Sequence, residues 1–263
     1  LQNDPVPALS TIGTDGVIVG TNANLDTLGT GAITIKASSF VSMMDGSRLR
    51  TANGNLIVEA NQQSPATTGN FVGISLFSAS IEVTGTGQLS LLGRGGNASG
   101  SQLGVWLQHG ASAVGSLVKG GSNGVSVNGT GGANAGSQNY GVRVAGTNSR
   151  ITSSGGAVLV EGRGGGTGTG STNVGVSVTT GGAITNAGLA STDTVTVKGF
   201  GGNPSSAGVG NNGVVVDGAN SQINSGGGAV LVEGTGGGAL TSTGNFGVVV
   251  SSAGGLITSA GTA

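Results

Sequence analysis

Few side chains in this 263-residue chain could carry out acid, base or nucleophilic chemistry. The single histidine is His109, and no serine or cysteine stands with it in a recognisable nucleophile motif. A histidine without such a partner is more often a polar surface group than a general base. The chain has no cysteine, which excludes disulfides, thiolate metal sites and cysteine nucleophiles. We therefore expect no catalytic triad.

Carboxylates are the second kind of side chain that could form a functional site. Glycoside hydrolysis needs a pair of them, and calcium needs several oxygen ligands. The ten acidic residues are Asp4, Asp15, Asp26, Asp45, Glu59, Glu82, Glu161, Asp193, Asp217 and Glu233. Their wide spread disfavours a catalytic pair, so we expect no enzyme. A calcium site near Asp15, Asp26 and Asp45 stays open as an alternative. The glycine-rich stretches lack the Lys-Ser/Thr ending of a phosphate loop, and we expect no cofactor.

Trp106 is the only tryptophan, and its ring could stack on a sugar. His109 stands nearby, and Arg143 occupies the position equivalent to Trp106 one repeat later. We take these three residues as candidate ligand contacts, with surface glycans as the candidate ligands. The alternative is that Trp106 packs under a neighbouring loop, as lone surface aromatics often do.

These residues must be positioned by a repeat, because a glycine followed by an apolar-any-apolar triplet occurs six times. The copies are Gly73-Ile74-Ser75-Leu76, Gly104-Val105-Trp106-Leu107, Gly141-Val142-Arg143-Val144, Gly175-Val176-Ser177-Val178, Gly213-Val214-Val215-Val216 and Gly247-Val248-Val249-Val250. By subtraction, their glycines are 31, 37, 34, 38 and 34 residues apart. A near-constant period of this length predicts a solenoid.

Two further apolar marks recur with the same period. A second triplet occupies 33–35, 56–58, 89–91, 125–127, 158–160, 195–197 and 230–232. A third, weaker mark lies between the two triplets, at Leu49, Ile81, Val114, Ile151, Ile184, Ile223 and Ile257. Each period therefore holds three short strands, in which alternate residues face the interior.

Stacking such periods buries a continuous interior and predicts an all-β fold, a right-handed three-sided parallel β-helix. We expect about seven coils of ~35 residues, each with a glycine-rich loop after the second triplet. Residues 1–15 are predicted to be a lead-in or cap. Residues 16–263 are predicted to be a single repeat domain that ends inside a coil, with further coils to follow.

Equivalent positions of successive coils should form columns. One column runs Lys36, Glu59, Leu92, Asn128, Glu161, Lys198 and Glu233. In it, Glu161, Lys198 and Glu233 alternate in sign, which favours exposed ion pairs over a catalytic carboxylate pair. A second column holds the amides Asn70, Gln102, Asn139, Asn173, Asn211 and Asn245. We expect these amides to hydrogen-bond from coil to coil and to shape the turns.

The composition limits the kinds of partner and fold that are expected for this chain. Charged residues make up 7% of the chain and the net charge is −1, so no basic surface for nucleic acid is expected. No apolar run approaches the ~18 residues that a membrane-spanning helix needs. Glycine supplies 58 residues without a Gly-X-Y period, which excludes collagen.

The phrases Gly31-Ala32-Ile33-Thr34-Ile35-Lys36-Ala37 and Gly54-Asn55-Leu56-Ile57-Val58-Glu59-Ala60 resemble repeats of large bacterial surface proteins of the filamentous haemagglutinin and autotransporter-passenger type. The resemblance implies a right-handed parallel β-helix, secretion to the cell surface and an adhesive or stalk-like role. It carries no shared catalytic residues. The partners implied are adjoining coils of a longer chain.

Two other functions remain open at this stage. One is a carbohydrate-binding or polysaccharide-degrading β-helix, which a groove lined by Trp106, Arg143 and His109 would favour. The other is a filament in which copies of the chain stack end to end.

Overall fold

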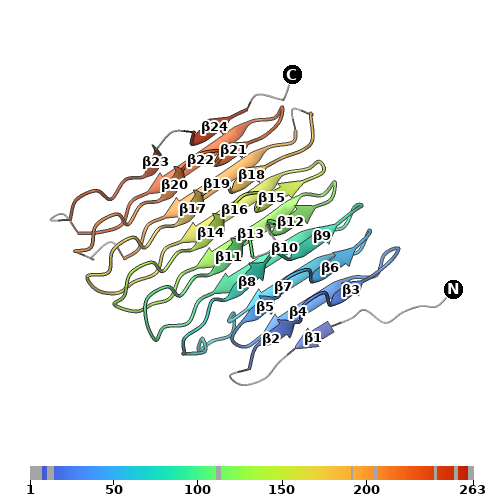
Figure 1. The fold of residues 1–263 in the computed structure, drawn as a ribbon, viewed down its shortest axis with the longest axis horizontal. Helices are drawn as coiled ribbons and strands as arrows, with labels where there is room; N and C mark the ends of the chain where they lie inside the picture. The colour runs from blue at the N-terminus through green and yellow to red at the C-terminus, as the bar shows by residue number, and fades with distance from the viewer. Residues whose placement is uncertain are drawn as a thin grey trace.

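The computed structural model describes residues 8–10, 15–110, 114–190, 192–203, 207–239, 242–251 and 254–259. Within these ranges the protein is all-β, without a helix, and consists of three parallel sheets of eight strands each (Figure 1). The chain visits the sheets in turn, so each strand pairs with the strand three places later.

The strands fall into three sets. Sheet A contains β1 (Ala8–Ser10), β4 (Ile33–Ala37), β7 (Leu56–Ala60), β10 (Leu89–Arg94), β13 (Val125–Thr130), β16 (Val158–Arg163), β19 (Val195–Phe200) and β22 (Val230–Thr235). Sheet B contains β2 (Val17–Val19), β5 (Val41–Met43), β8 (Ile74–Phe77), β11 (Val105–Gln108), β14 (Val142–Ala145), β17 (Val176–Thr179), β20 (Val214–Asp217) and β23 (Val248–Ser251). Sheet C contains β3 (Asn24–Asp26), β6 (Arg48–Thr51), β9 (Ser80–Val83), β12 (Leu117–Gly120), β15 (Arg150–Ser153), β18 (Ala183–Thr185), β21 (Gln222–Asn224) and β24 (Leu256–Thr258).

The strand register confirms the predicted stacking of coils. Val105 of β11 lies beside Val142 of β14, which lies beside Val176 of β17. Val176 in turn lies beside Val214 of β20. Because equivalent residues are paired from coil to coil in all three sheets, the fold is a parallel β-helix.

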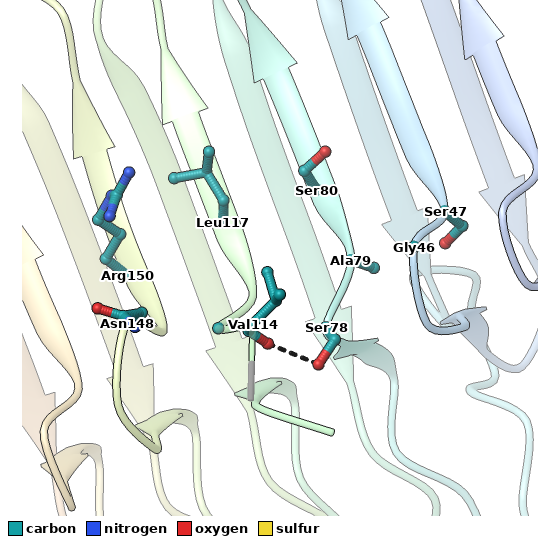
Figure 2. Close-up of a pocket in the computed structure, with 10 residues that line it drawn as sticks. Gly46, Ser47, Ser78, Ala79, Ser80, Val114, Leu117, Asn148 and Arg150 are labelled. Atoms are coloured by element: carbon teal, nitrogen blue, oxygen red, sulfur yellow. Dashed lines mark hydrogen bonds between the residues drawn. The ribbon is translucent and has the colours of Figure 1, made fainter. Parts of the chain in front are cut away.

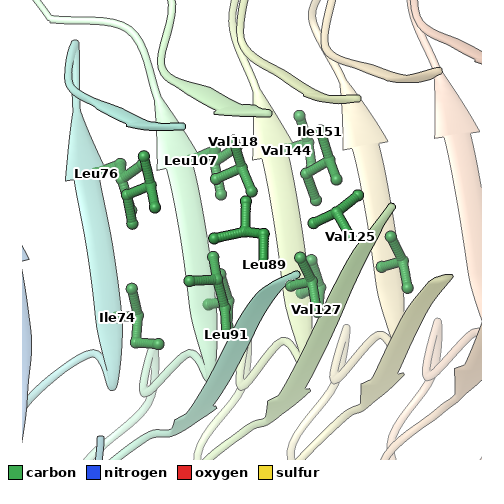
Figure 3. Packing of buried hydrophobic residues seen from close by; sticks show 14 of the residues in the cluster. Ile74, Leu76, Leu89, Leu91, Leu107, Val118, Val125, Val127, Val144 and Ile151 are labelled. Carbon is green, nitrogen blue, oxygen red and sulfur yellow. The ribbon is translucent and has the colours of Figure 1, made fainter. Parts of the chain in front are cut away.

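Aliphatic side chains from all three sheets fill the interior (Figure 3). Leu91 of sheet A, Leu107 of sheet B and Ile151 of sheet C are fully buried. No aromatic residue of the described chain belongs to this cluster. Burying one such side chain stabilises the fold by about 1.5–3 kcal/mol, so apolar packing holds the coils together.

Two details of the predicted pattern are corrected by the structure. The mark assigned to Val114 belongs to Val118, which pairs with Ile81 and Ile151 in sheet C, whereas Val114 is exposed. Val114 lies in the connection before β12, and the glycine that follows it made it look like the end of a strand. The strand β5 is absent from the predicted triplets because Phe40, not glycine, precedes it.

The first coil departs from the predicted period. Val17 of β2 pairs with Val41 of β5, so this coil is 24 residues long by subtraction. Only residues 38–40 connect β4 to β5, and the glycine-rich loop begins with the second coil. Within the segment predicted as a lead-in, β1 adds a strand to sheet A by pairing with β4.

From the second coil onward, the chain makes a long excursion after each sheet A strand. We name these excursions the flange: residues 61–72, 95–103, 131–140, 164–174, 201–212 and 236–246, of which 204–206 and 240–241 lie outside the described residues. Successive excursions are hydrogen-bonded to each other. For example, Gly132 donates its N–H to the Gln102 carbonyl, and Gly165 donates to Asn139, each at 2.7 Å. The predicted loops therefore form a stacked layer beside β8, β11, β14 and β17 (Figure 1).

Each excursion of the flange leaves the coil at the end of a sheet A strand and returns at the start of the next sheet B strand. We call this junction the neck, and its glycines let the outgoing and returning segments, the two arms, approach closely. A Cβ atom on Gly162, in β16, would overlap the carbonyl oxygen of Gly175, which precedes β17. The same contact recurs at Gly93, Gly129, Gly199 and Gly234 against Gly104, Gly141, Gly213 and Gly247. Glycine precedes the predicted triplets for a related reason, since a Cβ on Gly104, Gly141, Gly175 or Gly213 would overlap a backbone nitrogen at the end of a sheet A strand.

Candidate functional site

The amide column forms a hydrogen-bonded ladder inside the flange. The side-chain oxygen of each amide accepts the backbone N–H of its counterpart one coil earlier: Gln102 to Asn139 (3.0 Å), Asn139 to Asn173 (2.8 Å), Asn173 to Asn211 (2.9 Å) and Asn211 to Asn245 (2.7 Å). Asn139, Asn173 and Asn211 also donate from Nδ2 to a carbonyl three residues earlier. These three amides are buried, so their hydrogen-bonding groups serve the fold.

Trp106 and Arg143 lie side by side on the outer face of sheet B. They are register partners, and the Arg143 guanidinium lies 5.9 Å from the Trp106 ring centroid. It lies 5.0 Å from the centroid of Tyr140. Tyr140 belongs to a small apolar cluster with Leu103 and Val174, and Trp106 packs against this cluster. The sequence did not single out Tyr140, although it directly follows an amide of the ladder.

Two donors in this cluster lack an acceptor. Trp106 Nε1 and Arg143 Nε are both buried without a hydrogen-bond partner in the described part of the molecule. A buried donor left unpaired costs about 1–3 kcal/mol. His109 lies beyond the end of β11, where its Nδ1 is 3.2 Å from the Gly110 carbonyl. The structure thus places Trp106 beside Arg143, and His109 at a separate turn over Gly146.

The charged column follows the predicted order, but its ion pairs differ in detail. Lys36 pairs with Glu59 at 3.0 Å, and Lys198 pairs with Glu233 at 2.8 Å. The Glu233 carboxylate raises the pKa of Lys198. Glu161 is the register partner of Lys198, yet its ion pair is with Arg163 of its own strand, at 2.9 Å. Arg163 also lies 4.2 Å above the Phe200 ring centroid.

Sheet C carries a charge cluster that the sequence reasoning missed. Asp26 forms an ion pair with Arg48 at 2.5 Å and lies 3.7 Å from Arg50. The hydrogen bond from Arg48 lowers the pKa of Asp26, with a smaller opposing effect of burial. Within the described ranges, no three histidine, cysteine or acidic residues gather as a metal site would require.

A shallow groove of about 480 Å³ crosses the turns between sheets B and C (Figure 2). It extends across successive coils from Ser47 to Arg150, and the Ser78 hydroxyl donates to the Val114 carbonyl at 2.6 Å within it. Buried serines line these turns in a second ladder, in which Ser149 Oγ accepts the N–H of Ser116 at 3.2 Å. These serines stand two residues before a buried apolar residue of sheet C, which is the sequence signal that could have revealed them.

A second groove, of about 520 Å³, lies where sheet A continues into the flange. Its lining combines the Arg163 and Phe200 side chains with a floor of glycine backbone from four coils, including Gly165 and Gly202. The glycines are explained by close packing, because a Cβ on Gly165 would overlap the Gly132 carbonyl.

Comparison with protein-family models, curated proteins and solved structures found no match. A search for helices that could cross a bilayer, made over the described residues, found none.

Proposed function

We propose that the chain is a stiff structural segment of a long extracellular bacterial surface protein, without catalytic activity. In this role it is a stalk that holds attached parts of the protein at a fixed distance from the cell. The observation that carries the proposal is the unbroken register of three sheets, which link the strands from β1, β2 and β3 to β22, β23 and β24.

Stiffness follows from how each coil is held. Bending would have to stretch ladder hydrogen bonds on one side and compress a close-packed aliphatic interior on the other. The amide ladder extends the same coil-to-coil bonding into the flange. The parallel β-helix fold and the repeat phrases near Lys36 and Glu59 support the filamentous haemagglutinin and autotransporter-passenger type, and with it the location outside the cell.

The experiment is a distance measurement between two spin labels. Asn24 of β3 and Gln222 of β21 lie in one outward column of sheet C, six strand steps apart, and the chain has no native cysteine to mislabel. The variant Asn24→Cys/Gln222→Cys should give one narrow distance distribution near 29 Å plus the label length, from six steps of ~4.8 Å.

The matched control carries Asn24→Cys and Ser80→Cys, two steps apart, and should give about 10 Å plus the label length. Both samples are diluted with unlabelled protein so that only distances within one molecule are read. A broad distribution for the six-step pair, beside a narrow one for the control, would show a flexible chain and overturn the stalk.

The partly exposed Trp106 ring beside Arg143 favours a second candidate function, glycan binding at this pair. The indole ring would supply a stacking surface for a sugar. A glycan array tests it with the wild type and Trp106→Ala, with Phe246→Ala as the control because Phe246 is an exposed aromatic residue of the flange. Binding that only Trp106→Ala abolishes would support this function, and the absence of wild-type binding would exclude it for the glycans tested.

A further inference from the structure

The outer face of sheet A is the broadest regular surface of the described molecule, because its strands reach six residues where those of sheets B and C have three or four. Its first outward column runs Thr34, Ile57, Ser90, Ser126, Leu159, Thr196 and Leu231. Leu159 and Leu231 are 40% and 46% exposed. Parallel sheets usually have both faces covered, so exposed leucines on this face call for a partner.

We propose that the outer face of sheet A docks a second copy of the chain, face to face. The two copies are related by a two-fold axis that runs parallel to the strands and passes over β13. Such an axis keeps the strands of the two sheets aligned, as in packed β-sandwiches, and reverses the order of the coils. The strand β4 of one copy then faces β22 of the other, and β7 faces β19.

Charge complementarity selects this arrangement. In the charged column, Lys36 of one copy faces Glu233 of the second copy, and Glu59 faces Lys198. The symmetry repeats both contacts. Within each copy, Lys36 already pairs with Glu59 and Lys198 with Glu233. Docking therefore brings two ion pairs together head to tail, so that each charge lies beside two of opposite sign.

A shift of one coil in either direction destroys this match. In one direction, Glu59 of one copy faces Glu233 of the other. In the other direction, Lys36 faces Lys198 and Glu59 faces Glu161. Like charges brought together at an interface are strongly unfavourable, so the charged column fixes the register of the two copies.

The residues on the axis of the proposed interface are polar, with leucines beside them. Ser126 and Asn128 face their own counterparts across the axis, and Leu92 and Leu159 lie on either side of them. In this register Glu161 faces Leu92 of the second copy and Arg163 faces Arg94, and the Glu161 carboxylate that pairs with Arg163 offsets part of the repulsion between the two arginines. Seven strands, two of five residues and five of six, cover a face roughly 34 Å long and 17–20 Å wide. That area, about 630 Å² per copy, approaches the ~800 Å² per partner of a standard interface.

The test is sedimentation velocity of the 24.7 kDa chain over a range of concentrations, with charge reversals at two positions. The variants Lys198→Glu and Glu59→Lys each place like charges against each other twice in the dimer. Each should weaken dimerisation at least about tenfold. An equimolar mixture of the two variants should dimerise like the wild type, because both contacts become attractive in the mixed pair.

The mixture separates this contact from any effect inside one molecule. Glu59 and Lys198 lie four strand steps apart in one copy, about 19 Å, and cannot touch. The control Lys119→Glu, on sheet C, should leave the dimer unchanged, and far-ultraviolet circular dichroism shows that each variant is folded.

Four outcomes overturn the proposal. They are a wild-type monomer up to about 1 mM, a linear series of oligomers that indicates end-to-end stacking, a dimer insensitive to both reversals, and a mixture that stays monomeric.

Discussion

The coil body and the flange share one repeat and one stacking direction, but different forces hold them. The body buries aliphatic columns such as Leu91 and Val127 in its interior. The flange buries amides such as Asn173 and bonds backbone to backbone between coils. The flange ranges contain no Asp, Glu, Lys, Arg or His. One coil spacing can therefore be maintained by apolar packing in one part of the solenoid and by hydrogen bonding in the part beside it.

The two regions should differ in stability. A buried aliphatic side chain contributes about 1.5–3 kcal/mol, whereas one hydrogen bond contributes about 1 kcal/mol net. Glycine, abundant in the flange, also loses more chain entropy on folding than other residues. We expect the flange to open locally before the body unfolds, as weakly held segments do.

The largest effect is expected from a cavity in the body. Leu91→Ala should lower the free energy of unfolding by about 2–5 kcal/mol, because Leu91 is fully buried between its neighbours in the stack. The matched control is Leu92→Ala, since the next residue of the same strand faces outward. Urea unfolding followed by circular dichroism measures both variants. Equal losses for the two would contradict the assignment of inward and outward faces.

The second largest loss of stability is expected from a substitution at the neck of the flange. Gly162→Ala adds one Cβ that overlaps the Gly175 carbonyl, and such overpacking costs about 1–3 kcal/mol. Gly20→Ala is the control, because a Cβ at Gly20 meets no atom within 4 Å. Thermal unfolding should show a lower midpoint for Gly162→Ala alone. A neutral Gly162→Ala would mean that the two arms separate without cost.

The amide ladder should show a smaller and more local effect. Asn173→Ala leaves the N–H of Asn139 without its acceptor, at a cost of about 1–3 kcal/mol. Because the flange opens before the body, we expect faster hydrogen exchange in residues 131–140 and 164–174 and only a small shift of the global midpoint. Asn128→Ala, on the outer face of sheet A, is the control and should leave flange exchange unchanged. Uniformly faster exchange in all three sheets would show that body and flange are one cooperative unit.

The comparison also separates what the sequence could predict from what it could not. The repeat in triplets such as Val142 to Val144 predicted the strands and their register. Alternate residues of each strand are buried, and a shift of one residue would turn the apolar side chains outward. The prediction was wrong at Val114, which lies in the connection before β12. It missed β5, because the connection before this strand is short and has no glycine. The amide column was visible because every copy from Gln102 onward stands two residues before the glycine, whereas Asn70 stands three before it and the Gln102 side chain accepts the N–H of Phe71 instead.

Side-chain partners were harder to predict than columns. Glu161 has oppositely charged neighbours both in its own strand and in the next coil, and the column alone does not choose between Arg163 and Lys198. The pair of Asp26 and Arg48 was missed because its members lie two positions apart along neighbouring strands, outside one column. The stacking of the loops into a flange depends on backbone hydrogen bonds, which residue types do not encode directly.

The smallest change in stability is expected at acidic pH, and it should affect the body and not the flange. The pKa of Asp26 is lowered by the hydrogen bond from Arg48, so its contribution to stability is complete above the usual value near pH 4 and is lost as the pH falls through the lower folded value. Asp26→Asn removes the charge and should cost less than about 1 kcal/mol at pH 7, since the pair is partly exposed. The difference between Asp26→Asn and wild type in urea unfolding should shrink toward pH 3, where the wild-type carboxylate is increasingly protonated. The flange ranges contain no carboxylate. Acid should therefore weaken the body alone, and the protection of flange amides from hydrogen exchange should rise relative to that of body amides. A difference that stays constant from about pH 7 to 3 would show that the Asp26 and Arg48 pair adds nothing to the stability of the body.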